Sequence, residues 1–223
     1  MTMSTLREFR TAYCVLIATV VLQGVLYRHL PDPMPVHWNA DGVIDGRLAK
    51  PLGPWLGTLI LVGATVVMTL MPRLSPANFP MLPFARVYRH LATTFALFAL
   101  WVMLVTDAIA MGWPLSLPRH LLIAVGLLYV VLGNWMGKLT QNFYCGIRTP
   151  WTIANAEVWN RTHRLAGPLI MLAGIASLAG ASFSARVGFI LLAAGTVVGF
   201  ALPAVYSWWI SPPAAAEPPQ EDD

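Results

Sequence analysis

The sequence predicts an all-α integral membrane protein, a six-span helical bundle with a small extracytoplasmic β-hairpin loop and a cytoplasmic amphipathic helix. Its 223 residues are 57% hydrophobic and only 11% charged, which is more apolar than a water-soluble core and surface can accommodate together. Six segments approach or exceed the roughly 20 apolar residues that cross a bilayer. They are residues 11–29, 54–71, 88–111, 118–137, 165–182 and 186–209. An even number of spans places both termini on one side.

The first segment resembles a secretory signal, because Arg7 and Arg10 precede an apolar run. The run is too long for a signal-peptide core and lacks a convincing small-residue cleavage site. We therefore interpret residues 1–10 as a cytoplasmic N-terminus. Residues 11–71 then hold spans 1 and 2, the first of them an uncleaved anchor.

Basic residues determine the predicted orientation. With the N-terminus inside, nine of the fourteen Lys and Arg residues lie on the cytoplasmic side: Arg7, Arg10, Arg73, Arg86, Arg89, Lys138, Arg148, Arg161 and Arg164. Because cytoplasmic loops carry an excess of Lys and Arg, this distribution predicts a multi-pass protein with both termini inside. Anionic lipids of the inner leaflet attract such residues, so the net charge of +4 requires no direct contact with nucleic acid.

The remaining spans lie in residues 72–210. Three GxxxG pairs, Gly53 and Gly57, Gly133 and Gly137, Gly195 and Gly199, predict close helix packing within one bundle, because small residues let helices approach in lipid. The segment after them, residues 211–223, is rich in Pro and acidic residues and poor in apolar ones. We expect this tail to be disordered.

The long outer loop, residues 30–53, contains "LPDPMPVHWNADGVIDGRLAK". Its alternating prolines enforce an extended entry, and two Asp-Gly dipeptides favour turns, so we predict a β-hairpin that caps the outer face. Candidate ligand-binding residues on it are His37, Trp38, Asn39, Asp41, Gly42 and Asp45.

The same loop has the H-x-N-x-D-G outline of a calcium loop. The first ligand is His37, however, and position twelve is Leu48, so it is not an ordinary EF-hand. A His/Asp site that combines His37 with His29, His120, Asp41 or Asp45 is the alternative. We predict no metal and no other cofactor.

The long inner loop, residues 138–164, has two helix starts. Thr149 and Pro150 suit an N-cap and the first helical position, and Asn155 offers a second cap. From these caps we predict an amphipathic helix over "AEVWNRTHRLAG" that lies at the membrane surface before span 5. Glu157 is placed to pair with Arg161, four residues on, or with the guanidinium of Arg148.

Two interpretations of this loop stay open. Interfacial anchoring accounts for Trp151, Trp159 and Arg164. It accounts less well for Arg148 and His163 in a segment shaped by Gly and Pro, and these residues favour a functional surface.

Asp107 is the one acidic residue within a predicted span. A carboxylate inside a membrane is a functional candidate by default. Asp107 lies about a turn from the outer end of its span, so solvation at the interface and pairing with Arg119 are the alternatives.

The two long loops resemble the SdpI family of bacterial membrane proteins. "GNWMGKLTQNFYCGIRTPWTIANAEVWNRTHRLAG" is similar to the signature of that family, and the outer loop is similar to the small Pro-rich extracytoplasmic domain of unknown function that often precedes it. The resemblance marks Asn134, Lys138, Asn142, Gly146, Ile147, Arg148, Thr149, Pro150, Trp151, Trp159, Thr162, His163, Arg164 and Gly167. It implies a protein of the bacterial inner membrane that gives immunity to a secreted toxic peptide outside and recruits a small repressor inside.

Three classes of function are open to this sequence. A binding and signalling membrane protein leads, because two elaborate loops face opposite sides of the bilayer. A transporter is the alternative, although carriers place several polar residues at mid-membrane and these spans offer few. An enzyme ranks last, because the sequence contains no HExxH, no GxSxG and no paired intramembrane aspartates.

Overall fold

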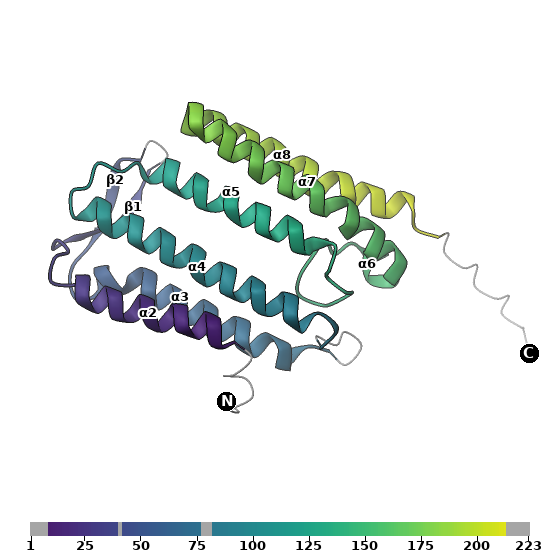
Figure 1. The fold of residues 1–223 in the computed structure, drawn as a ribbon, viewed down its shortest axis with the longest axis horizontal. Coiled ribbons are helices and arrows are strands. Elements are labelled where there is room, and N and C mark those ends of the chain that lie inside the picture. The colour runs from purple at the N-terminus through teal and green to yellow at the C-terminus, as the bar shows by residue number, and fades with distance from the viewer. Residues whose placement is uncertain (1–8, 40–41, 77–81, 213–223) are drawn as a thin grey trace, which may run out of the picture.

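A computed structural model describes residues 9–39, 42–76 and 82–212 (Figure 1). In this part of the chain, long helices run back and forth along one direction, and one small hairpin lies at their end. The long helices are α2 (Arg10–Leu26), α3 (Leu52–Leu70), α4 (Ala85–Ala110), α5 (Leu117–Met136), α7 (Ala156–Phe183) and α8 (Ala185–Trp209). The shorter elements are η1 (Met71–Leu74), η2 (Leu82–Phe84) and α6 (Pro150–Ala154).

Hydropathy and length confirm the membrane class. Among the described residues, five helices are long and apolar enough to cross a bilayer, namely Leu52–Leu74, Ala85–Ala110, Leu117–Met136, Ala156–Phe183 and Ala185–Trp209. The helix Arg10–Leu26 is apolar but has only 17 residues, about 25 Å at 1.5 Å per residue. Six spans with both termini inside therefore stay a prediction.

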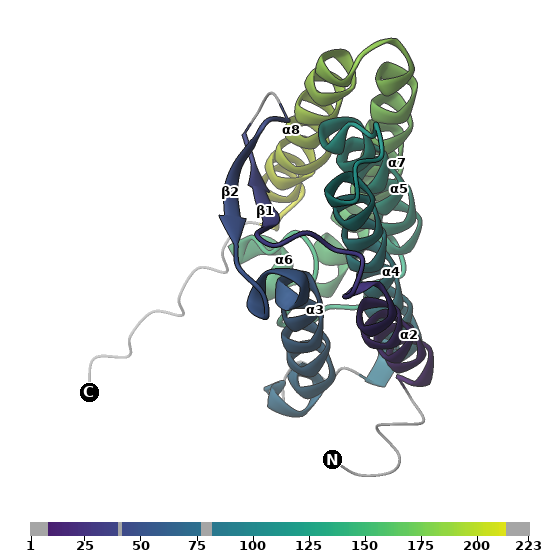
Figure 2. The ribbon, with the colours of Figure 1, turned by 90° about the vertical axis from the view of Figure 1, so that its left-hand side faces the viewer.

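The predicted β-hairpin is confirmed, while its extracytoplasmic side stays a prediction. Strands β1 (Met34–Trp38) and β2 (Ile44–Leu48) pair antiparallel, with a register shift in the middle. Met34 is buried, while His37 in the same strand is exposed. Gly42 has a φ of 79°, and a Cβ there would lie 3.0 Å from the Cδ of Pro118 at the start of α5. Figure 2 shows the hairpin reaching from the α2 and α3 group toward the group of α5, α7 and α8.

The hairpin and the inner loop occupy opposite ends of the bundle. In Figure 1 the strands lie beside the C-terminal end of α2 and the N-terminal end of α3, whereas α6 lies at the other end, beside the last turns of α5 and α8. The two candidate sites are therefore separated by the length of the helices.

Glycines bring α5 and α7 into close contact. A Cβ at Gly133 would lie 2.6 Å from the carbonyl oxygen of Gly167, and one at Gly174 would lie 2.5 Å from that of Gly126. Gly199 similarly packs on Ile170. Close helix packing is thus confirmed at Gly133 and at Gly199, one glycine of each of two predicted GxxxG pairs. Gly57 has nothing within 4 Å, so Gly53 and Gly57 do not form such a helix contact.

The amphipathic segment differs from its expected form. It does not lie apart from span 5 but forms the first turns of α7, which continues unbroken from Ala156 to Phe183 in spite of an internal proline at 168. The reason is tertiary burial. Trp159 and His163 point into the protein and are 0% and 1% exposed, so this face packs on the inner loop rather than on lipid headgroups.

An aromatic core lies under the inner loop and links it to the N-terminal helices. Phe84 and Tyr88 are buried edge to face, with ring centroids 6.2 Å apart. The Tyr88 hydroxyl donates to the carbonyl oxygen of Met68 at 2.8 Å. Trp159 and Ile147 belong to the same buried cluster, so the loop is held against α4 as well as against α7.

Candidate functional site

Asn142 is the centre of the turn that opens the inner loop. Its Oδ1 accepts hydrogen bonds from the backbone N–H groups of Tyr144 (2.9 Å) and Cys145 (2.7 Å). Its Nδ2 donates to the carbonyl oxygens of Thr140 (2.9 Å) and Cys145 (3.0 Å). The side chain is fully buried. Both of its polar atoms are engaged by the backbone of the loop, so Asn142 shapes this turn.

His163 and Trp159 hold the middle of the loop. The N–H of Ile147 donates to Nε2 of His163 at 2.9 Å, so Nε2 must be the unprotonated ring nitrogen. Nδ1 then carries the hydrogen and donates to the carbonyl oxygen of Trp159 at 2.8 Å. The indole Nε1 of Trp159 in turn donates to the carbonyl oxygen of Leu139 at 2.7 Å. Both nitrogens of a neutral His163 are occupied, which leaves none for acid-base work.

Gly146 is required by this packing. Its φ is 114°, a conformation that L side chains rarely adopt. A Cβ at Gly146 would also overlap Nε2 of His163. The glycine in the signature therefore serves the contact between loop and helix.

Threonines connect the loop to α8. The Thr149 side chain accepts from the N–H of Thr152 at 3.2 Å and caps α6, as its sequence predicted. The Thr149 hydroxyl also lies 2.9 Å from that of Ser207 on α8. At the other end of α6, Gln141 donates to the carbonyl oxygens of Thr152 and Ile153 at 2.8 and 2.6 Å.

Outside this framework, the signature presents exposed cations that rest on aromatic rings. The guanidinium carbon of Arg148 lies 4.5 Å from the ring centroid of Phe143, and Nζ of Lys138 lies 4.3 Å from that of Trp135. The exposed Arg164 lies beside the end of α5, next to Gly137. We call Lys138, Arg148, Arg161 and Arg164 the cationic surface; all four are exposed.

The expected ion pairs of Glu157 are not found. Among the described residues the one ion pair is His37 with Asp45. Arg161 instead donates to the hydroxyl of Tyr206 at 3.1 Å, and Arg148 stacks on Phe143. The physical reason is that rings and hydroxyls close to these arginines hold them away from the exposed carboxylate of Glu157.

Cys145 is not an activated nucleophile. Burial raises the pKa of its thiol, and the nearby Arg148 guanidinium only partly opposes this. A thiol needs a lowered pKa to react as thiolate at neutral pH. Cys145 therefore acts as a small, protonated packing residue.

The candidate outer residues form a hydrogen-bonded hairpin. Nδ1 of His37 lies 2.6 Å from Oδ1 of Asp45, and both side chains are well exposed, 70% and 45%. Oδ1 of Asn39 accepts from the N–H of Val43 at 2.9 Å. Trp38 is half-buried, and Asp41 lies outside the described residues. Within the described ranges no group of three or more His, Cys, Asp or Glu is gathered for a metal ion.

Asp107 follows neither expected alternative. It is 2% exposed, so it is not solvated at the interface, and the described residues give it no ion pair with Arg119. Its carboxyl group meets the Gln23 side chain of α2 instead. Gln23 was missed from the sequence, where the usable signal was an amide within an otherwise apolar span.

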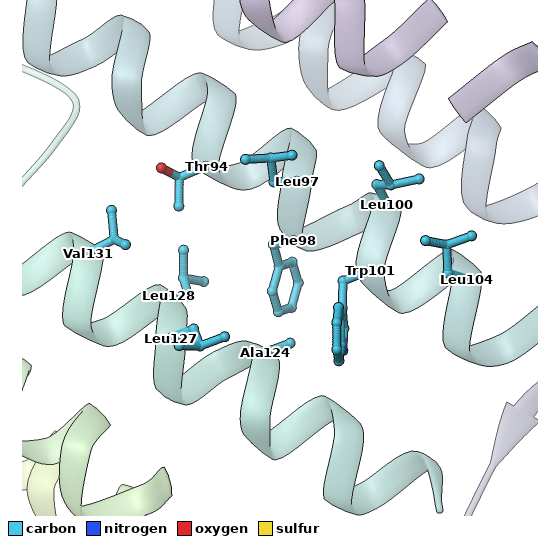
Figure 3. Close-up of a pocket in the computed structure, with 10 residues that line it drawn as sticks. All are labelled: Thr94, Leu97, Phe98, Leu100, Trp101, Leu104, Ala124, Leu127, Leu128 and Val131. Carbon is cyan, nitrogen blue, oxygen red and sulfur yellow. The ribbon is translucent and has the colours of Figure 1, made fainter. Parts of the chain in front are cut away.

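A groove between α4 and α5 has a volume of about 320 Å³ (Figure 3). Its lining is apolar apart from the hydroxyl of Thr94, which donates to the carbonyl oxygen of His90 in its own helix. The lining side chains of Leu97, Trp101 and Leu127 are exposed, so the groove is open to the surroundings of the protein. Such a lining suits a hydrocarbon chain, and the lining residues include no acid, base or nucleophile arranged for catalysis.

These features define a class, that of a multi-helix membrane protein with a β-hairpin at one end of the bundle and, at the other end, a loop on a buried polar framework. Residues 138–207 match the SdpI/YfhL protein family, and residues 14–62 match a domain of unknown function, DUF1648. The immunity protein SdpI of Bacillus subtilis (strain 168) is 25% identical over 156 residues, which cover 67% of this chain and 70% of that protein. The resemblance seen in the two loops is confirmed, and the chain is an SdpI-like membrane protein. No solved structure matches it.

Proposed function

We propose that this SdpI-like protein gives its cell immunity to a secreted antimicrobial peptide and relays that encounter to a cytoplasmic regulator. The similar protein of Bacillus subtilis is named as an immunity protein. The observation that carries the proposal is the division of residues 138–164 into a buried framework and an exposed cationic surface. Immunity and signalling are binding functions, so we propose no catalytic role for the chain.

The proposed orientation places the hairpin outside and the cationic surface inside. It rests on the excess of Lys and Arg that the sequence assigns to the cytoplasmic side and on the separation of the two loops along the bundle. The hairpin then meets the peptide. His37, Trp38 and Asn39 offer the polar and aromatic contacts.

The cationic surface fits a partner with acidic groups. A guanidinium stacked on a ring keeps its planar fork of donors available for a carboxylate. Arg148 is held in this way on Phe143, and the described residues supply it no carboxylate. If the surface served only to attract anionic lipid, each cation would contribute about 1 kcal/mol of membrane binding. The orientation of the Arg148 guanidinium would then not matter.

The experiment separates charge from geometry at Arg148. Arg148→Lys keeps the charge and the contact with the ring but loses the bidentate fork. We expect the affinity for the partner to fall by about tenfold, or about 1.4 kcal/mol, and survival against the cognate killing peptide, or induction of the adjacent operon, to fall with it.

The matched control is Arg186→Lys, the same change at an exposed arginine near the opposite end of the bundle. We expect this control to behave as wild type at equal membrane abundance. Wild-type survival and induction with Arg148→Lys as well would contradict the proposed surface and leave the loop an anchor.

A further inference from the structure

A buried polar group lies beneath the hairpin, where α2, α3 and α4 meet. Nε2 of Gln23 on α2 donates to the carbonyl oxygen of Pro54 on α3 at 2.7 Å. One turn deeper, the hydroxyl of Thr58 donates to Sδ of Met103 on α4 at 3.7 Å. Because α3 and α4 run in opposite directions, the residue one turn outward from Met103 lies level with Pro54. That residue is Asp107, and it meets Gln23.

Two oxygens in this group have no partner. Oε1 of Gln23 and Oδ2 of Asp107 are buried and accept no hydrogen bond from any described residue. Gln23 is 0% exposed and Asp107 is 2% exposed. A buried acceptor without a donor costs about 1 to 3 kcal/mol, and an unpaired buried carboxylate costs more. Two such oxygens on side chains that meet therefore imply that a donor is missing.

Charged side chains do not supply this donor. Helix α3 contains no ionisable residue. The nearest ones to Gln23 along α2 are Tyr27, whose ring faces Trp55 and Lys50, and Arg28, and the nearest along α4 is His90. Arg28 is exposed, and His90 is several turns away and stacks on Trp135. On the hairpin and on α5, His37 and Arg119 are exposed.

We propose that Asp107 is a proton-binding site, with the proton on Oδ2 donated to Oε1 of Gln23. The amide of Gln23 then donates one N–H to the other carboxyl oxygen of Asp107 and its second N–H to Pro54. A carboxylic acid and a primary amide pair in this way through two parallel hydrogen bonds. One proton satisfies both orphaned oxygens and removes the charge.

A proton fits this site better than a metal cation. Cations such as Ca²⁺ and Mg²⁺ take about six or more oxygen ligands. The group offers two unpartnered oxygens, while the Pro54 carbonyl already accepts from Gln23 and the Thr58 hydroxyl already donates to Met103.

Protonation of Asp107 would affect how firmly the helices hold the hairpin. Strands β1 and β2 lie between α2 and α3 in the chain, and the acid-amide pair ties α2 to α4 directly below them. Loss of the proton leaves a carboxylate facing an amide oxygen and favours separation of these helices. Proton binding at Asp107 does not depend on the proposed immunity function.

Infrared spectroscopy of the full chain in lipid vesicles tests the site. We expect the C=O band of a protonated carboxylic acid at neutral pH, where exposed acids are ionised, and its loss in Asp107→Asn. In Gln23→Leu the band should persist at a shifted frequency, because the acid loses its acceptor. Absence of the band from the wild type overturns the proposal. A band that appears only after sodium is replaced by choline also overturns it, in favour of a cation site.

Unfolding experiments give a second measurement. A folded protein that holds a proton released on unfolding becomes less stable as pH rises. Asn at 107 reproduces the donor and acceptor of the protonated acid, so the Asp107→Asn variant should lack this part of the pH dependence. Melting temperatures of the two proteins should therefore diverge as pH is raised from mildly acidic to alkaline. Parallel profiles overturn the proposal.

Discussion

Individual signature residues divide by whether their polar atoms are engaged inside the protein. Asn142 and His163 are buried, with their hydrogen-bonding atoms used by the loop itself. Arg148 and Lys138 are exposed and rest on rings. If a substitution at a buried residue such as Asn142 abolishes function, the cause is therefore expected to be misfolding. If a substitution at an exposed residue such as Arg148 does so, the cause is expected to be lost binding.

Asn142→Asp tests this division. The new Oδ2 cannot donate, so it faces the carbonyl oxygens of Thr140 and Cys145 that Nδ2 now serves. Two hydrogen bonds are lost and a buried acceptor is added, which we expect to destabilise the protein by about 2 to 4 kcal/mol. Chemical denaturation in detergent, monitored by tryptophan fluorescence, measures it.

The control is Asn134→Asp, the same change at an exposed signature residue on α5. It should alter stability by less than about 0.5 kcal/mol. Equal losses for the two variants would refute the division into framework and surface.

The sequence marks candidate residues in the inner loop but does not show what each one does. The resemblance marked Asn142, His163 and Arg148 alike, because a motif records residue types at fixed spacings. Which of them is buried depends on how the loop folds back on α7, and that contact joins residues as far apart as Leu139 and Trp159. Gln23 was missed for the same reason, since its partners Pro54 and Asp107 lie on other helices.

At the scale of elements, local signals were reliable where the cause is local. The cap at Thr149 and the second cap at Asn155 form as expected, each with its side chain accepting from the N–H groups of the next turn. Whether the segment after Asn155 forms a separate surface helix or the start of α7 depends on tertiary burial instead. Its amphipathic pattern suits a membrane surface and a protein core equally well, so the pattern did not reveal one continuous α7.

Close contact between α5 and α7 makes a further element-level prediction. A Cβ at Gly133 would lie 2.6 Å from both the carbonyl oxygen of Gly167 and the N–H nitrogen of Met171. These are backbone atoms, so the helices must move apart. Gly133→Ala should destabilise the protein by about 1 to 3 kcal/mol, measured as a lower melting temperature in detergent.

Gly137, in the same GxxxG pair, provides the matched control. A Cβ there meets its nearest atoms on Arg164 at 3.8 Å, an ordinary van der Waals contact. We expect Gly137→Ala to leave the melting temperature within a degree or two of wild type. A larger loss from Gly137→Ala than from Gly133→Ala would show that this helix contact does not limit stability.

At the scale of the whole molecule, the bundle holds its two polar loops apart. The hairpin packs on the end formed by α2, α3 and the start of α5, and the cationic surface gathers at the end that carries α6. Long apolar helices lie between them. Any signal from one loop to the other must therefore pass along helices, and α4 contacts both the group at Asp107 and the aromatic core under the inner loop.

Membrane orientation is the prediction that belongs to this scale, because the excess of basic residues on one side predicts it. Alkaline phosphatase becomes active only outside the cytoplasm, where its disulfides form. Fused after Lys50, at the end of the hairpin, it should be active, and fused at Ser211, after α8, it should be inactive. A fusion after Ser184, between α7 and α8, should again be active, since that turn lies at the hairpin end. An inactive fusion at Lys50 together with an active one at Ser211 would invert the orientation, and it would place the cationic surface where a secreted peptide, rather than a cytoplasmic regulator, meets it.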